Sequence, residues 1–524
     1  MTESFAYDTV TYPSMVHPQM HPCALAAIAR LHGIHAASPA HCRLLEIGCG
    51  EGVQLLALAM AYPDSEFIGV DMSHAAIARG EVARTALGLG NLHLVAADLT
   101  NWDPGTRMFD YVIAHGFYSW VPQHVRECLL ALCGKQLAPH GVAYVSYNAL
   151  PGRRIRQMTW EMMKHHVRHL SDPQQRIDGA REFLMWLGEN VPASKSYSGA
   201  VQAEAEHILN DVDPIVLFHD DLSDTNDSFS ITEFIESARH HGMEFLAEAS
   251  YSDMSDAMLT EECAASLIRL TGNDRVEREQ YLDFLKGRRF RQTLLCRRTG
   301  KPSSEMQISS IAALEVVGAL QTESGTAANL AAGKTERFVA GESASIATDH
   351  PVAKAALELI GKAFPQPVRF QDLLARSRTL AGSSAADAES VAEMLRTVVA
   401  AAFQRGLVDL QCDPPRFAAT AGRCPLLSPL ARLQLEQELP VLTSMRPSMV
   451  RLDSIPAREL LRQLDGRKDR SAILYGLAAS MSAMEIPGSD GRVERQPIDW
   501  WLEQLGPNLE DGLRDAARMA LLVE

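Results

Sequence analysis

The first 150 residues alternate apolar runs of strand length with helix-like segments. Five such runs can be followed, at 44–47, 67–70, 92–97, 109–114 and 142–146. Glycine or polar residues follow each run. Strands that alternate with helices form parallel sheets that carry helices on both faces. The pattern therefore predicts a doubly wound α/β domain.

The next stretch departs from this alternation. Residues 153–215 show three helical, polar-faced segments, each with an apolar stripe, punctuated by Pro173, Pro192 and Pro214. Such stripes suit a lid or a dimer interface, and they equally suit packing within their own domain. We therefore predict a helical insertion here and leave both roles open.

The strands missing from the sheet appear after this insertion. A helix is expected at 231–238, and strands at 243–249 and 290–296, with a smaller helical insertion at 255–287. The fold class is thus α/β: a Rossmann-like, seven-stranded domain built from residues 1–152 and 216–300.

A linker-like stretch at 299–304 opens the second half of the chain. Residues 301–424 predict a mixed α+β, winged-helix-like middle domain, and residues 425–524 a mainly helical C-terminal domain. The helices expected in the middle domain are 352–363, 370–376 and 389–404, followed by a strand pair at 407–411 and 416–419. The third helix carries only Arg396 and Arg405 as cations, too few to read a DNA duplex.

The turn after the first apolar run carries the most specific chemistry. Gly48, Gly50 and Gly52 make it tight enough for an extended ligand to lie against main-chain N–H groups. Asp71 follows at the distance where a carboxylate can accept both hydroxyls of a ribose. The turn therefore predicts a site for a nucleoside-containing cofactor.

The charge of this turn indicates the kind of cofactor. Its spacing is G-x-G-x-G, and Glu46 and Glu51 add negative charge that would repel a pyrophosphate. The same charge suits a cationic sulfonium or an α-ammonium group. Asp98, after the third run, can hydrogen-bond an adenine amino group. The predicted cofactor contacts are Glu46, Gly48, Cys49, Gly50, Gly52, Asp71, Met72, Asp98, Leu99 and His115.

The composition of the chain narrows the classes of partner and of cellular location that remain. The chain has 524 residues and a net charge of −16, which argues against nucleic acid as a partner and would favour a cationic substrate such as lysine. Its nine cysteines show no C-x-x-C pair, as expected of reduced thiols in a cytoplasmic protein. No apolar stretch is long enough to span a bilayer, so no membrane insertion is expected, and no metal site is predicted.

The series of strand ends resembles the class I S-adenosylmethionine-dependent methyltransferases. Other runs, at 7–14, 118–122, 218–222 and 290–295, resemble the bacterial methyltransferases with a regulatory domain, which include the rickettsial outer-membrane-protein lysine methyltransferases. The resemblance implies S-adenosyl-L-methionine as cofactor, lysines of a large outer-membrane or surface protein as acceptors, and a helical dimerisation insertion that would make a homodimer.

Four residues at strand ends are the candidate substrate contacts. We expect Tyr118 and Tyr147 to supply walls and hydroxyls, Trp120 a face for the alkyl-ammonium chain, and Asn148 a polar anchor. The competing interpretation is that these aromatic rings only cover the core. Tyr12 and His21 are expected to fold over the cofactor.

Three functions remain open at this point. The leading one is a protein lysine N-methyltransferase. The alternatives are a small-molecule methyltransferase, and a catalytically silent cofactor-binding regulatory protein.

Overall fold

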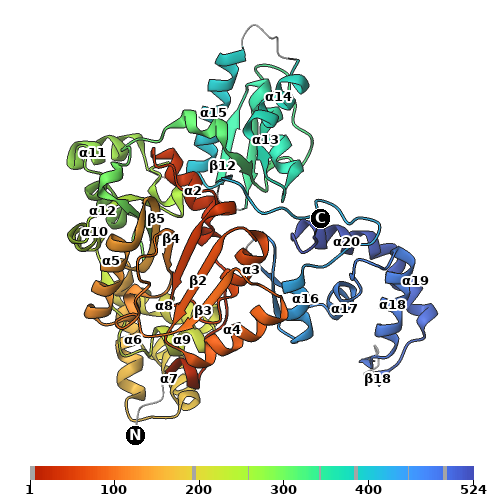
Figure 1. Cartoon of the computed structure of the whole chain (residues 1–524), viewed down its shortest axis with the longest axis horizontal. Helices are drawn as coiled ribbons and strands as arrows, with labels where there is room; N and C mark the ends of the chain where they lie inside the picture. Colours follow the sequence, from red (N-terminus) through yellow and green to blue (C-terminus); the bar gives the residue numbers. More distant parts are fainter. Residues whose placement is uncertain are drawn as a thin grey trace.

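The computed structural model describes residues 6–191, 196–257, 259–341, 344–382, 388–446, 448–487 and 493–523. Figure 1 shows an α/β domain with the helices of the insertion below it, a middle domain around α13–α15 above it, and C-terminal helices α16–α20 to one side. Within these ranges no helix is both long and apolar enough to cross a membrane.

The central sheet has the strand order β3-β2-β1-β4-β5-β8-β7, and β6 pairs separately with β5. Its strands are β1 Arg43–Ile47, β2 Glu66–Asp71, β3 Leu92–Ala96, β4 Phe109–Ala114, β5 Leu137–Ala149, β6 Ser228–Phe229, β7 Met243–Glu248 and β8 Phe290–Arg297. The first five run parallel, whereas β8 is antiparallel to both β5 and β7. The predicted seven-stranded Rossmann-like sheet is confirmed, with β6 as an addition.

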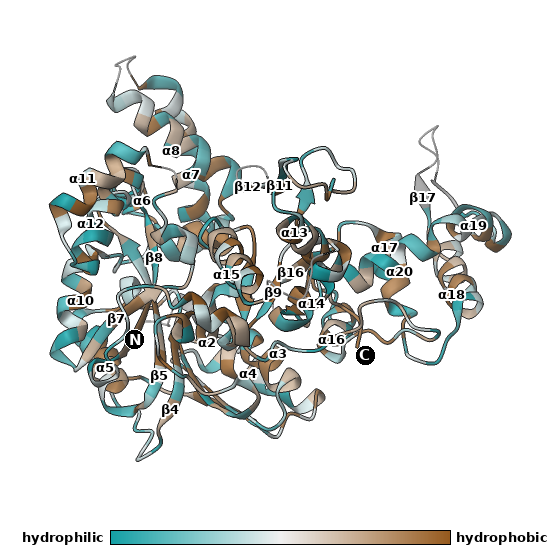
Figure 2. Ribbon diagram, turned by 90° about the horizontal axis from the view of Figure 1, so that it is seen from above, coloured by the Kyte–Doolittle hydropathy of each residue, from teal (hydrophilic) through white to brown (hydrophobic). Residues whose placement is uncertain are grey.

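Helices bury both faces of this sheet. Alternate strand residues such as Leu44 and Leu45 belong to different apolar clusters. One cluster includes α2 (Pro22–Leu31) and α3 (Val53–Ala61), and the other includes α5 (Gln123–Gln136) and α10 (Ile231–His240). Helix α4 (His74–Ala86) follows β2. The central strands are mostly brown in Figure 2, as a sheet covered on both faces requires.

The insertion consists of helices that pack on one another. They are α6 Arg153–Val167, α7 Pro173–Asn190, α8 Tyr197–Asp211 and α9 Pro214–Asp220. Trp160, Met163, Leu184 and Ile208 form a separate apolar core between them. The predicted stripes therefore supply contacts within the insertion itself. Pro192 lies outside the described residues. The second insertion is also helical, with α11 Glu261–Thr271 and α12 Arg275–Lys286.

The middle domain shares its apolar core with the α/β domain, since Phe370, Leu395 and Phe403 belong to the cluster that includes α2. Its elements are η6 Ile308–Ala313, β9 Glu315–Val317, β10 Gln321–Thr322, β11 Glu336–Ala340, β12 Ala344–Thr348, α13 Pro351–Ala363, β13 Val368–Arg369, α14 Phe370–Leu380, α15 Ala388–Gln404 and β14 Asp409–Gln411.

One predicted strand of the middle domain is wrong. Residues 416–419 form no strand, and β14 pairs with β9 instead. Pro414 and Pro415 lack the amide hydrogens that a returning hairpin strand would donate, and Asp413 before them has a left-handed φ of 45°. The ladder partner therefore comes from 92 residues earlier in the chain.

The C-terminal residues fold around their own apolar core, which includes Leu442, Leu477 and Leu513. The elements are α16 Pro429–Glu436, β15 Val441–Thr443, β16 Met449–Arg451, α17 Ile455–Arg462, α18 Arg470–Ser482, β17 Ile486–Pro487, β18 Val493–Glu494, α19 Ile498–Leu505 and α20 Leu509–Arg518.

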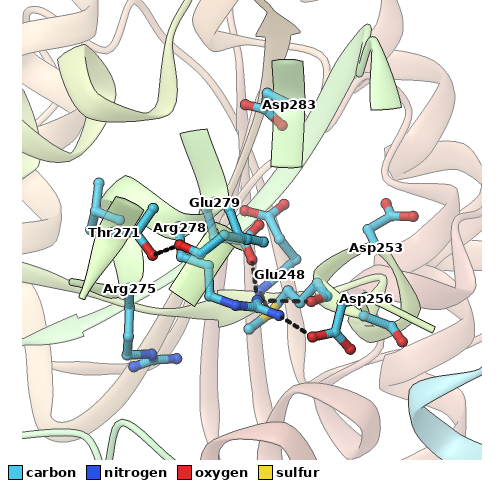
Figure 3. A network of polar contacts seen from close by, with 12 residues as sticks. Glu248, Asp253, Asp256, Thr271, Arg275, Arg278, Glu279 and Asp283 are labelled. Atoms are coloured by element: carbon cyan, nitrogen blue, oxygen red, sulfur yellow. Dashed lines mark hydrogen bonds and ion pairs between the residues drawn. The ribbon is translucent and has the colours of Figure 1, made fainter. Parts of the chain in front are cut away.

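A buried ion network fastens α12 to the edge of the central sheet (Figure 3). The guanidinium of Arg291, on β8, has no exposed surface. It donates to Glu248 Oε1 at 2.5 Å, to both oxygens of Asp283 at 2.9 Å, and to Glu279 Oε2 at 3.1 Å. Glu248 belongs to β7, so one cation joins two strands and a helix.

We predict that Arg291→Met destabilises the α/β domain by about 3–5 kcal/mol, because it leaves buried carboxylates without their cation. The matched control is Arg298→Met, whose side chain is 65% exposed and should cost less than about 1 kcal/mol. Chemical denaturation measures both values. Equal effects of the two substitutions would contradict the role assigned to the network.

Candidate functional site

The glycine turn is built as the sequence predicts. Gly48, Gly50 and Gly52 all have positive φ, at 73°, 56° and 70°. A Cβ on Gly48 would lie 2.9 Å from the ring of Phe117, whereas one on Gly50 would point into open space. The Gly48 N–H donates to the Val70 carbonyl at 2.8 Å. The turn therefore closes tightly against β2 while its middle glycine stays open to a ligand.

Asp71 holds the turn from the end of β2. Its Oδ2 accepts from the Gly50 N–H and its Oδ1 from the Ser73 N–H, both at 2.8 Å. Burial raises the pKa of Asp71, although the hydrogen bonds from Ser73 and Gly50 oppose this shift. Each carboxylate oxygen keeps a second lone pair, so Asp71 can still accept from a ligand.

A cavity of about 260 Å³ opens beside this turn. Its walls come from the turn, the N-terminal segment before α2, the ends of β2 and β4, α9 and the start of β8. The predicted site residues that line it are Glu46, Gly48, Cys49, Gly50, Asp71, His115 and Trp120. The structure thus brings together most of the cofactor contacts and one of the substrate contacts.

Three buried polar atoms in this cavity have no partner among the described residues. They are Glu46 Oε2, Gln54 Nε2 and Trp120 Nε1. Burial, and then the neighbouring Asp71, raises the pKa of Glu46 to about 8. Buried polar groups are normally hydrogen-bonded, so the cavity fits a ligand that brings a cation and further polar groups.

The charge of the turn differs at one residue from the charge that the sequence predicted. Glu51, expected to add negative charge to the turn, accepts from Arg79 Nε at 2.5 Å. Its charge is therefore compensated. The unbalanced carboxylate of the turn is that of Glu46.

Four predicted cofactor contacts do not line the cavity. The side chain of Met72 is 52% exposed, Leu99 is buried in the core, and Asp98 accepts from its own loop at Thr100. Met72 and Asp98 follow the ends of neighbouring strands, since the Ala97 N–H donates to the Asp71 carbonyl at 2.9 Å. Gly52 begins α3. Their contact with a cofactor stays a prediction.

The prediction that Tyr118 and Tyr147 form walls of the substrate site needs correction, because the structure places both rings in the core. Tyr147 has no exposed surface, its ring lies 4.3 Å from that of Phe234, and its hydroxyl accepts from Thr293 at 3.2 Å. Tyr118 is 4% exposed and packs on Phe229 at 5.0 Å. The pleat of β5 turns alternate side chains to opposite faces, and Tyr147 faces away from the cavity.

Asn148 lies behind the cavity wall, where it positions other groups. It is 1% exposed, and its Nδ2 donates to Asn226 Oδ1 at 2.7 Å. Asn226 in turn donates to the backbone carbonyl of Asp220 at 2.6 Å. Asp220 lines the cavity, so Asn148 supports the wall indirectly, and its contact with a substrate stays a prediction.

The N-terminal segment was expected to cover the cavity through Tyr12 and His21, and only one of these two residues does so. Tyr12 lines it, and the ring of His17 packs on that of His115 with centroids 3.9 Å apart. His21 does not line it. Its Nδ1 accepts from the Cys23 N–H at 3.1 Å and caps α2.

Sequence reasoning did not select Asp220, Phe290, His17 or Gln54 as cavity residues, and for residues 219–221 it favoured a capping role over contact with a substrate. Asp220 and Phe290 lie in the runs 218–222 and 290–295, but neither was selected as a site residue. Burial, and then the charge of Asp221, raises the pKa of Asp220 to about 7, and Arg153 and Arg156 oppose the shift.

Three family descriptions match separate parts of the chain. They are a methyltransferase domain at 44–141, a predicted methyltransferase regulatory domain at 213–297, and a PKMT C-terminal winged-helix domain at 424–521. The last match assigns a winged helix to the region predicted only as mainly helical. A winged-helix-like fold for 301–424 stays a prediction.

Individual relatives extend the likeness over the whole chain. The uncharacterized protein RP789 of Rickettsia prowazekii (strain Madrid E) is 28% identical, over 92% of this chain and 87% of its own. The uncharacterized protein RP028 of the same strain is 32% identical, over 45% of this chain and 95% of its own. PKMT2 from Rickettsia typhi, solved in complex with AdoHcy, aligns with a TM-score of 0.85 at 25% identity, over 98% of this chain and 100% of its own.

The fold, the glycine turn and the comparisons together define the protein as an S-adenosylmethionine-dependent methyltransferase. The chain belongs to the family of these enzymes that includes the rickettsial PKMTs. The enzyme class predicted from the sequence is therefore confirmed.

We predict that Tyr147→Phe leaves methyl transfer within about twofold of wild type, because the hydroxyl contacts only the core. The lost hydrogen bond should cost about 1 kcal/mol of stability. Trp120→Phe, which removes an unpartnered donor from the cavity, should instead lower transfer without lowering stability. Rates of label transfer and thermal unfolding measure both. A large loss of transfer by a stable Tyr147→Phe enzyme would restore the tyrosine as a substrate contact.

Proposed function

We propose that the protein transfers methyl groups from S-adenosylmethionine to lysine ε-amines of a protein substrate. One observation carries the proposal: a half-buried carboxylate, Asp220, shares the cavity of the glycine turn with Trp120 and Phe290. These groups suit a cationic alkyl chain, whose charge a carboxylate and an aromatic face both attract.

The chain's own residues fit the cofactor at the other end of the cavity. Glu46 would accept from the α-ammonium group, and Asp71 from the ribose hydroxyls, while Gly50 lets the ligand approach the turn. The bound cofactor supplies an activated methyl group. The protein then has to orient the acceptor nitrogen and exclude water.

Asp220 can accept the proton that the lysine ammonium group must lose before methyl transfer. A lysine ammonium has no lone pair for methyl transfer at neutral pH. With a pKa raised by burial to about 7, Asp220 can hold the incoming ammonium and take up its proton. Trp120 and Phe290 would exclude water from the freed amine, which lowers the cost of keeping it neutral.

The comparisons support a protein as the acceptor. The C-terminal family description and the aligned Rickettsia structure both carry the designation PKMT. An outer-membrane or surface protein as substrate, a cytoplasmic location and a homodimer are further parts of this proposal.

Labelled methyl transfer tests the acceptor directly. Purified enzyme, labelled S-adenosylmethionine and a lysate should yield methyl-lysine in digested protein, located by mass spectrometry. Label in a small extractable metabolite would favour the small-molecule alternative. No transfer to any fraction, with the cofactor bound, would favour the silent regulator.

Asp220→Asn should lower kcat/KM about 10–150-fold, because a charge-assisted hydrogen bond is lost. The rise of kcat/KM as pH passes through about 7, where the Asp220 carboxylate ionises, should disappear as well. Asp224→Asn is the control, since Asp224 is exposed in the loop that follows α9. An unchanged pH profile in the Asp220 variant would contradict its role.

Cofactor binding should release protons below pH 8. Glu46, whose pKa burial raises to about 8, carries a proton at pH 7, and an α-ammonium group beside it favours the ionised form. The affinity of the enzyme for the cofactor should therefore rise with pH up to about 8 and then stay constant. Calorimetry in buffers of different ionisation enthalpy measures the release, which Glu46→Gln should abolish. Identical proton release by wild type and variant would contradict this assignment.

A further inference from the structure

A second cavity, of about 270 Å³, lies where the three parts of the chain meet. The α/β domain contributes the start of α2 and residues 250–252 after β7, the middle domain contributes β14 and its flanks, and the C-terminal part contributes Arg446. Helix α2 packs against β14 of the middle domain at this junction. We name it the interdomain cavity.

The two cavities share a thin wall. His17 and Met20 line the cofactor cavity, whereas Pro18, Gln19 and His21 line the interdomain cavity. These residues form η1 (Pro18–Met20) and its flanks. Neighbouring residues of this segment line opposite cavities, so a single stretch of chain separates the two.

His21, which lines the interdomain cavity, carries an unused ring donor. Its Nδ1 accepts from the Cys23 N–H at 3.1 Å, and burial lowers the pKa of its ring to about 3. The ring is therefore neutral and its proton sits on Nε2. Nε2 is buried and finds no acceptor among the described residues. An unpaired buried donor is costly, so the position favours a ligand carbonyl.

The cavity offers no net charge to a ligand. Its two charged lining residues, Asp409 and Arg446, pair with each other at 3.3 Å. The guanidinium of Arg446 also lies over the ring of Phe364, 4.9 Å from its centroid. No spare cation is left for a phosphate or a carboxylate, and a neutral ligand fits best.

The remaining walls are mainly flat and apolar. Tyr251 and Phe403 stack with centroids 4.9 Å apart, and Phe417, Pro365, Pro414 and Pro415 also line the cavity. Gln19 and Gln411 add amide groups that can donate and accept. Apolar rings beside amides and a single N–H donor suit an uncharged peptide residue with an apolar side chain.

We propose that the interdomain cavity binds such a residue of the substrate polypeptide, near the methylated lysine in sequence, with its carbonyl accepting from His21 Nε2. The inference rests on the proposed function, because a protein substrate can reach both sides of the shared wall. The cavity would then select for sequence around the lysine.

Blocked, lysine-free peptides of the form acetyl-Gly-X-Gly-amide probe the cavity without methyl transfer. Ligand-observed NMR should detect millimolar binding when X is Phe or Leu and none when X is Asp. Ser252→Trp should abolish binding by filling the cavity, since Ser252 lines it. The control is Ser309→Trp at an exposed position. His21→Asn keeps a capping oxygen for α2 but removes the donor, and should weaken binding about three- to tenfold.

S-adenosylhomocysteine affinity should stay within twofold in all three variants, which verifies that they are folded. Equal binding by the Ser252 and Ser309 variants, equal binding when X is Asp, or no binding when X is Phe or Leu would overturn the inference. Peptide binding without any lysine methylation would instead contradict the proposed function. Methylation without peptide binding would contradict this docking site alone.

Discussion

Two carboxylates, Glu46 and Asp71, are held largely out of water at the carboxyl edge of the central sheet, and the site is arranged around them. Hydrogen bonds from Gly50 and Ser73 satisfy Asp71 in part. Glu46 keeps an oxygen without a partner among the described residues. Burying a charge is unfavourable unless an opposite charge joins it, so the fold favours a ligand that brings one. The α-ammonium group of S-adenosylmethionine meets that requirement.

The part of the cavity proposed to receive the lysine includes residues that follow the first five strands in the sequence. Asp220 ends α9, the last helix of the insertion, and Phe290 opens β8. Arg291, next to Phe290, is locked by the buried network with Glu248 and Asp283. Residues far apart in the sequence thus depend on insertion packing and on one ion network for their common position. Residues 213–297, which match the predicted methyltransferase regulatory domain, thus contribute Asp220 and Phe290 to a cavity formed mainly by the methyltransferase domain.

The sequence predicted those parts of the site that local geometry determines. Three glycines at this spacing allow the positive φ values that the turn adopts, and the lengths of β1 and β2 place an acidic residue near the end of each strand. Tyr147 was misplaced because a run of buried strand residues does not reveal which face each side chain takes. Asp220 was missed because its approach depends on how α9 packs. The pairing of β14 with β9 likewise depends on a contact between distant segments.

The most direct test of the central claim compares two ligands that share a nucleoside but differ in their charged groups. S-adenosylhomocysteine has an α-ammonium and an α-carboxylate group, whereas 5′-methylthioadenosine lacks the amino-acid end. If the unpartnered carboxylate of Glu46 receives that group, calorimetry should show S-adenosylhomocysteine binding about 10–150-fold more tightly, the value of one charge-assisted hydrogen bond. Equal affinities for the two ligands would contradict the account.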